Sequence, residues 1–281
     1  MQIRELPYNE IPQKLKDISQ PAKRLFVCGE IHKNENKNLV IVGSRKHSSY
    51  GKQVLCDIIA GLVGYPINII SGLALGIDTL AHEQALKHGM TTISFPGSGL
   101  ANSSLHPQTN IRLAEKIVES GGCLFSEFTP DFKATQYSFP QRNRLMAAYS
   151  DAVLIIEAEE KSGTLITARL AMEYNRDLLV VPGSIYSETS RGTNYLINQG
   201  ATPVLSAKDV LLALGFDVKT KNERNDISDE EHIILSILRE PMSRDEIIRE
   251  CDNPPEEVNS LLMIMELRGL ITEDAGYFRK T

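Results

Sequence analysis

The segment 38–78, NLVIVGSRKHSSYGKQVLCDIIAGLVGYPINIISGLALGID, decides the fold class of this chain. It holds two apolar runs, NLVIV and INII, which are rich in β-branched residues and are stopped by glycine or serine. An amphipathic stretch with helical spacing, YGKQVLCDIIAGLVG, lies between them. Strands that are buried on both faces have continuous apolar runs, so the segment predicts parallel strands covered by helices.

The same alternation continues along the following hundred or so residues. Further apolar runs stop at glycine, serine, proline or a charged residue: TTISFPGSG, CLFSEF, DAVLIIEA and DLLVVPGS. Amphipathic stretches such as TLITARLAMEYN separate most of them. The predicted class is therefore a doubly wound α/β fold with a mostly parallel sheet.

Composition is ordinary for a soluble globular protein, with 281 residues, 42% of them hydrophobic and 23% charged. The first twenty residues contain no apolar signal region, and no run approaches the roughly 18 apolar residues that a membrane helix needs. We therefore expect a cytoplasmic protein without a membrane contact. The cysteines are scattered without metal-ligand spacing, so we expect reduced thiols, no metal and no cofactor: Cys28, Cys56, Cys123 and Cys251.

Charge is divided unevenly along the chain. Residues 229–281 hold 13 acidic and 6 basic side chains, whereas the remainder holds 23 acidic and 24 basic ones. A polyanion would therefore meet the body of the chain before its tail. The polar stretch around 221–228 suits a linker, which predicts an N-terminal segment at 1–34, a main domain at 35–220 and a small domain at 229–281.

Glycine-rich turns follow most of the predicted strands. In open parallel sheets the ligand lies beyond the carboxyl ends of the strands, where such turns and helix N-termini present backbone N–H groups. Several such turns together predict a phosphate-binding site: Gly43-Ser44-Arg45, Ser71-Gly72, Pro96-Gly97-Ser98-Gly99, Lys161-Ser162-Gly163-Thr164 and Pro182-Gly183-Ser184.

No motif for bond breaking accompanies these turns. The sequence has no G-x-x-x-x-G-K-[ST] loop and no nucleophile elbow, and Asp78 and Glu127 stand singly at strand ends. A binding protein is favoured over an enzyme. Two other classes stay open, a Rossmann-type nucleotide-binding sensor and a nucleoside-monophosphate hydrolase of the lysine-decarboxylase-like class.

Seven motifs in order closely resemble the bacterial DNA-processing family DprA, also called Smf. They are VGSR, ISGLALGIDTLAH, FPGSGL, LHPQTNIRLAEKI, GGCLFSEF, the segment 138–184 and SRGTNYLINQGATPV. The resemblance runs from about Pro12 to Leu214 and implies an extended Rossmann-like domain. It also implies a protein that binds and protects single-stranded DNA, forms a homodimer and helps to load RecA in natural transformation and recombination.

The resemblance also implies site residues. In the family, the arginine of the GSR turn and the residues around F-P-x-R-N-R line the DNA site, which here gives Arg45, Phe139, Arg142, Asn143 and Arg144. Some relatives carry a lysine shortly before that phenylalanine, where this chain has Gln136 with Lys133 nearby. With the glycine-rich turns, the predicted DNA-binding set is Gly43, Ser44, Arg45, Gly72, Lys133, Phe139, Gln141, Arg142, Asn143, Arg144, Lys161, Ser162, Gly163 and Thr164.

These residue types suit sequence-tolerant binding. Arginine pairs two phosphate oxygens at once, and neither arginine nor a glycine-rich turn is expected to read base edges here. Phe139, and with it Tyr137, offers a face on which an unstacked base can rest. The family interface uses the helix matched by TNYLINQGA, so Tyr195, Leu196 and Ile197 are the expected dimer contacts.

The tail has the pattern of a small winged-helix domain, a type that many DprA proteins carry at this end. Ser243 with Glu246 predicts a capped second helix, Pro254-Pro255 opens a third, and GLITEDAGYFRK suits a wing of two strands. The third helix carries Glu256, Glu257 and Glu266 against Arg268 alone. A protein contact or a structural role is therefore favoured over duplex binding.

Overall fold

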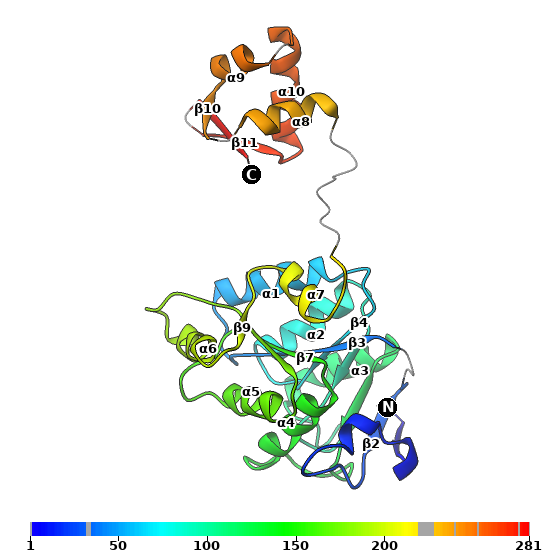
Figure 1. The fold of residues 1–281 in the computed structure, drawn as a ribbon. Coiled ribbons are helices and arrows are strands. Elements are labelled where there is room, and N and C mark those ends of the chain that lie inside the picture. The colour runs from blue at the N-terminus through cyan, green and yellow to red at the C-terminus, as the bar shows by residue number, and fades with distance from the viewer. Residues whose placement is uncertain are drawn as a thin grey trace. The chain divides into compact units, whose positions relative to one another are not determined.

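The computed structural model describes residues 2–31, 35–218, 228–238, 240–251, 253–274 and 276–280. The chain forms two compact units, Met1–Val218 and Lys219–Thr281 (Figure 1). All of the predicted linker except Ser228 lies outside the described residues. No helix within the described ranges is long and apolar enough to cross a membrane.

The large unit is built on a nine-stranded sheet with the order β1-β2-β6-β5-β4-β3-β7-β8-β9. The strands β6, β5, β4, β3, β7, β8 and β9 pair in parallel with their neighbours in this order. Strands β1 and β2 add an antiparallel edge beside β6. The strands are β1 (Ile3–Glu5), β2 (Phe26–Gly29), β3 (Lys37–Val42), β4 (Ile67–Ser71), β5 (Thr92–Ser94), β6 (Cys123–Ser126), β7 (Ala152–Ile155), β8 (Asp177–Val180) and β9 (Thr202–Pro203).

Helices cover both faces of this sheet (Figure 1). They are α1 (Ser49–Gly61), α2 (Ile77–Lys87), α3 (Ile111–Glu119), α4 (Ser138–Tyr149), α5 (Thr164–Glu173), α6 (Glu188–Asn198) and α7 (Ala207–Ala213), with 3-10 turns η1 (Tyr8–Glu10), η2 (Gln13–Leu15) and η3 (Gln108–Asn110). The central strand β3 explains the two layers, because its successive side chains point to opposite faces. Val40 and Val42 pack with α4 and α5, whereas Leu39 and Ile41 pack with α1, α2 and α7.

The N-terminal segment is part of the large unit's core. Leu6, Ile11, Leu15 and Leu25 are buried in the same cluster as the residues of α4 and α5. Strand β2 continues the segment into the sheet by pairing with β6. The segment therefore supports the helix α4, which carries several of the predicted site residues.

The described residues of the small unit form three helices and a three-stranded antiparallel sheet with the order β10-β12-β11. Its elements are α8 (Asp229–Ile237), β10 (Met242–Ser243), α9 (Arg244–Glu250), α10 (Pro255–Leu267), β11 (Ile271–Asp274) and β12 (Tyr277–Lys280). Ser243 and Glu246 form the predicted capping box, and Pro255 occupies the first turn of α10. The predicted fold class, a mostly parallel α/β sheet with a winged-helix domain, is confirmed.

Candidate nucleic-acid interface

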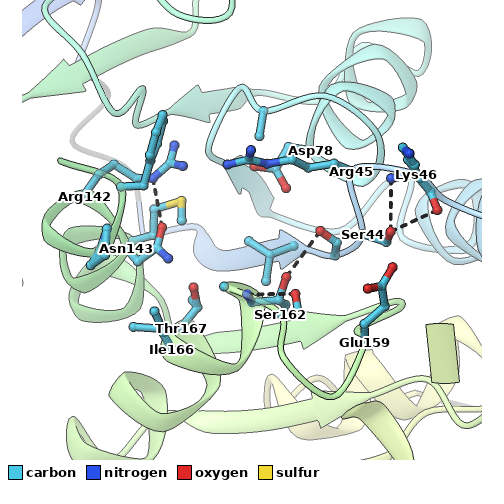
Figure 2. A pocket seen from close by; sticks show the side chains of 18 of the residues that line it. Ser44, Arg45, Lys46, Asp78, Arg142, Asn143, Glu159, Ser162, Ile166 and Thr167 are labelled. Atoms are coloured by element: carbon cyan, nitrogen blue, oxygen red, sulfur yellow. Dashed lines mark hydrogen bonds between the residues drawn. The ribbon is translucent and has the colours of Figure 1, made fainter. Parts of the chain in front are cut away.

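A pocket of about 660 Å³ lies beyond the carboxyl ends of β3 and β4. It is bounded by the turn between β3 and α1, by α4 and by the N-terminus of α5. Figure 2 shows Arg45 and Lys46 on one side of this pocket, and Asn143 and Thr167 on the other. A volume of this size is typical of small-ligand sites in proteins.

The turn after β3 presents two cations. The Ser44 hydroxyl donates to the Lys46 carbonyl at 2.9 Å and accepts from the Lys46 N–H at 3.1 Å, which folds the turn tightly. Arg45 and Lys46 are both exposed, and neither forms a salt bridge with a described residue. The Arg45 guanidinium lies 5.5 Å from the centre of the Phe139 ring. The turn thus offers unpaired positive charge beside an aromatic face.

Close packing explains why glycine starts this turn. A side chain at Gly43 would meet Ile77 of α2, whose atoms lie as near as 2.7 Å to the position of its Cβ. The N-terminus of α5 packs against the same turn, because the Thr164 hydroxyl donates to the Gly43 carbonyl at 3.3 Å. Just before this helix, the Ser162 hydroxyl accepts from the Thr164 N–H at 3.1 Å. The two glycine-rich turns therefore form one wall.

Arg142 lies beneath the pocket and is only 5% exposed. Its guanidinium donates to the carbonyls of Gly72 and Phe95, and its Nε donates to Asn143 Oδ1 at 3.0 Å. Burial lowers the pKa of Arg142 to about 10, against the attraction of the Asp78 carboxylate. These partners hold the Arg142 guanidinium in place at the base of the pocket, which Arg142 lines.

Asp78 reaches the same pocket from the start of α2 and is 5% exposed. Its Oδ2 accepts from the Gly72 N–H at 3.1 Å. Burial raises the pKa of the Asp78 carboxyl to about 6, although the Arg142 charge favours the ionised form. One turn further along α2, burial and the Arg142 charge lower the pKa of His82 to about 3. His82 is therefore neutral at physiological pH.

The structure brings nine of the fourteen predicted DNA-binding residues together around the pocket. They are Gly43, Ser44, Arg45, Phe139, Arg142, Asn143, Ser162, Gly163 and Thr164. Gly72 lies under the pocket as a partner of Arg142 and Asp78. Arg144 is directed elsewhere, because it pairs with Glu127 and donates to the Gln20 carbonyl. The remaining predicted residues are exposed but do not line the pocket: Lys133, Gln141 and Lys161.

Sequence reasoning missed several residues of the pocket. Lys46 directly follows the GSR turn, and Thr167 stands three residues after Thr164 on the same face of α5. Glu159 and Ile166 also line it. The helical spacing from Thr164 was the one signal that could have indicated Thr167.

The predicted dimer residues on α6 differ in their surroundings. Tyr195 is 56% exposed, whereas Leu196 is 4% exposed and belongs to the core. Ile197 is partly buried against the same core. Tyr195 instead borders a groove of about 360 Å³ between α5 and α6, together with Leu165, Ile166, Arg169, Met172, Leu196 and Gln199. Tyr195 and Met172 are thus the exposed apolar residues of this face.

The described part of the chain contains no candidate metal site. No three or more His, Cys, Asp or Glu side chains among those residues are grouped so that they could hold a metal ion. The four cysteines are free thiols, and burial raises the pKa of Cys123 to about 12. The pocket therefore offers cations, hydroxyls, two side-chain amides and two carboxyl groups, Asp78 and Glu159.

Comparison with protein families gives two matches. The family described as DNA recombination-mediator protein A matches residues 4–215, and the DprA winged helix domain matches residues 219–277. Protein Smf of Escherichia coli is 35% identical over 283 residues, covering 95% of this chain and 74% of that protein. DNA processing protein DprA of Streptococcus pneumoniae is 38% identical over 205 residues, covering 73% of this chain and 71% of that protein.

Two solved structures are similar to the chain. DprA from Streptococcus pneumoniae matches with a TM-score of 0.69 and 35% identity, over 75% of this chain and 74% of that one. DprA from Helicobacter pylori, which was solved to describe its single-stranded DNA binding mode, matches with a TM-score of 0.68 and 32% identity. That match covers 76% of this chain and 95% of the Helicobacter pylori chain.

Proposed function

This chain belongs to the DNA-processing protein A (DprA, or Smf) family, and on that premise we propose that it binds single-stranded DNA in the pocket beyond β3. The observation that carries this proposal is the exposed pair Arg45 and Lys46, which has no described salt-bridge partner, with Arg45 beside the Phe139 ring. Cations that are unpaired in the free protein can accept phosphates without first breaking a salt bridge.

The pocket favours a single strand over a duplex. Phe139 is half-buried, with Arg45 near one part of its ring and the His106 ring centre 5.8 Å away. An unstacked base can rest against such an aromatic side chain, which contributes about 1 to 3 kcal/mol per base in single-strand binding. A duplex has no free base face to offer. Phosphate contacts by Arg45 and Lys46 then hold the strand without regard to most of its sequence.

We also propose the finer roles of the family for this chain: protection of incoming single strands, help in loading RecA, and a homodimer. The groove between α5 and α6 supports the dimer, because Tyr195 and Met172 are 56% and 45% exposed on adjacent helices. Apolar side chains gathered in this way are typical of a protein contact. RecA loading rests on family membership alone.

Binding without catalysis is our proposal for the pocket. One observation favours a second candidate, hydrolysis of a nucleoside monophosphate: the buried Asp78 carboxyl, whose pKa is about 6, borders the pocket. Its oxygen already accepts the Gly72 N–H, which is a structural task. Incubation with nucleoside monophosphates, followed for release of the free base, distinguishes the two. Base release would favour the hydrolase.

A mobility-shift experiment tests the main proposal. Labelled single-stranded and double-stranded oligonucleotides of equal length are titrated with the full chain at two salt concentrations. We expect tighter binding of the single strand and weaker binding at the higher salt concentration. Equal affinity for both forms, or an affinity that ignores salt, would count against single-strand binding through this pocket.

A further inference from the structure

A second group of exposed aromatic and apolar side chains lies at the carboxyl edge of the sheet, outside the pocket. Tyr50 in the first turn of α1 is 48% exposed, and Tyr186 in the loop between β8 and α6 is 88% exposed. Ile185, which precedes Tyr186, is exposed as well. Exposed apolar side chains that gather at one place typically mark a contact with another molecule. We call Tyr50, Ile185 and Tyr186 the β8 platform.

Tyr50 is held in a fixed position beside the loop that follows β8. Its hydroxyl donates to the Pro182 carbonyl at 2.8 Å, which joins α1 to this loop. The start of α1 is fixed as well, because the Ser48 N–H and hydroxyl donate to the buried Glu157 carboxylate at 2.9 and 2.5 Å. A ring that is already held in place loses little conformational freedom when another molecule contacts it. Tyr50 is therefore a preorganised aromatic surface.

The loop that carries Ile185 and Tyr186 is anchored at its base. The Asn194 amide donates to the Gly183 carbonyl at 3.0 Å and accepts from the Gly183 N–H at 3.3 Å. Glycine is required at position 183, because a side chain there would collide with Ser190. The loop then extends outward before α6 begins (Figure 1). Its exposed side chains are thus presented from a fixed base.

The platform continues from the turn that carries Arg45 and Lys46. Lys46 precedes Tyr50 by four residues in the chain. Strands β3, β7 and β8 are neighbours in the sheet, so their carboxyl ends follow one another along this edge. The chain leaves β7 towards α5, which packs on the opposite face of the sheet from α1. Tyr50, on the α1 side, therefore connects Lys46 with the loop of Tyr186.

The charge and size of this surface suit a strand of nucleic acid. Residues 181–187 carry no charged side chain, and the exposed Lys46 forms no salt bridge with a described residue. Single-strand sites combine cations that follow the phosphates with aromatic rings on which successive bases stack. A protein interface usually takes roughly 20 to 30 residues from each partner. The platform is far smaller, so a strand is the better match.

We propose that a single strand bound at Arg45 and Lys46 continues over the β8 platform, where bases outside the pocket stack on Tyr50 and Tyr186. This inference rests on the proposed single-strand binding and extends it to a longer site. Stacking on an aromatic side chain tolerates any sequence, because every base has a flat face. One stacked base changes affinity by about 5- to 150-fold. The platform therefore contributes affinity only to strands that are long enough to reach it.

Fluorescence anisotropy with two labelled strands of equal length tests the proposal. One probe is oligo(dT), and the other keeps thymines only in its middle and carries abasic nucleotides on both sides. The two probes have the same backbone charge, so phosphate contacts alone would not separate them. The wild type should bind oligo(dT) more tightly, because only this probe offers bases to the platform while its middle fills the pocket.

Three substitutions assign the difference to the platform. Tyr50→Ala and Tyr186→Ala should each lower the affinity for oligo(dT) by at least about 5-fold and leave the affinity for the abasic-flanked probe unchanged. Tyr186→Phe keeps the ring, so it should restore the affinity that Tyr186→Ala loses. Tyr8→Ala removes an exposed tyrosine ring from the N-terminal segment and is the matched control. Thermal melting establishes that each variant is folded.

The outcomes separate this inference from the function on which it rests. Unchanged oligo(dT) affinity in both alanine variants would overturn stacking on the platform and leave single-strand binding in the pocket intact. An equal loss for both probes would also overturn it, since the substitutions would then act on the pocket. Unchanged affinities with an altered sedimentation coefficient would assign the surface to a protein contact instead. Failure of the wild type to bind either probe would overturn the proposed function, and this inference with it.

Discussion

Replacement of Arg45 and Lys46 by alanine is the most direct perturbation of the pocket. Both side chains are exposed and have no salt bridge with a described residue, so their loss leaves no buried charge unpaired. Stability should therefore change little. A hydrogen bond to a charged group contributes about 1.5 to 3 kcal/mol, which predicts a 10- to 150-fold loss of single-strand affinity for Arg45→Ala.

Salt dependence gives a second and more specific magnitude. Each phosphate contact in a single strand contributes about 0.7 to the slope of log affinity against log salt. Loss of both cations should therefore reduce the slope by about 1.4, equivalent to about a 7-fold smaller effect of a fourfold rise in salt. This difference is independent of contacts made outside the pocket. The two slopes to compare are those of the wild type and of the double variant Arg45→Ala with Lys46→Ala.

Anisotropy titrations at several salt concentrations measure both quantities. Lys208→Ala on α7 removes an exposed cation outside the pocket and serves as the single-charge control. Circular dichroism and thermal melting establish that the variants are folded. If the double variant keeps the wild-type slope, or if Lys208→Ala loses as much affinity as Arg45→Ala, the assignment of the phosphate contacts to this turn is refuted.

Four further predictions concern folding, pH, the tail and assembly. Arg142→Met removes three hydrogen bonds and leaves Asp78 without its buried partner, so we expect a loss of about 3 to 5 kcal/mol in chemical denaturation; an unchanged midpoint would contradict the role of these contacts. The folded pKa of His82 is about 3, below its ordinary 6.5, so the unfolded chain takes up the proton first as pH falls. Protonation of His82 in the unfolded chain should therefore lower the free energy of unfolding by about 2 kcal/mol between pH 6.5 and pH 5. The free energy of unfolding of His82→Gln should lack this part of the pH dependence. A chain that ends at Val218 contains all of the large unit, and it should fold and bind single strands at least as well as the full chain in a mobility shift; weaker binding by a folded truncated chain would give the small unit a direct DNA contact. Tyr195→Glu places a charge on the apolar face between α5 and α6, so we expect sedimentation to report monomers, whereas an unchanged dimer would move the interface elsewhere.

Local sequence patterns were sufficient for the fold class. The apolar run of β3 is buried on both faces, and this double burial is the physical reason that a parallel strand lacks polar alternation. The capping box of Ser243 with Glu246 and the proline that opens α10 are contacts between near neighbours. Glycine at position 43 marked the turn beside the pocket, because a tight turn against α2 has no room for a side chain. Such features depend on residues a few positions apart.

The roles within the motif SFPQRNR were decided by tertiary structure. Arg142, Asn143 and Arg144 are consecutive in sequence, yet one lies under the pocket, one faces it and one pairs with Glu127. Arg142 is held by carbonyls 70 and 47 positions away in the chain. A helix turns by about 100° per residue, so neighbours point in different directions, and only the packing of α4 against the sheet determines which direction is the pocket.

The position of Asn143 and Thr167 in the wall of the pocket is likewise a product of packing between α4 and α5. A sequence shows that an amide and a hydroxyl are present, but it does not show whether their hydrogen bonds are satisfied by the protein. That depends on the distance to every other donor and acceptor in the fold. The sequence thus predicted a phosphate-bearing ligand at this edge of the sheet, and the tertiary structure decided which of its side chains are exposed and which are paired, because burial and pairing are properties of three-dimensional contacts.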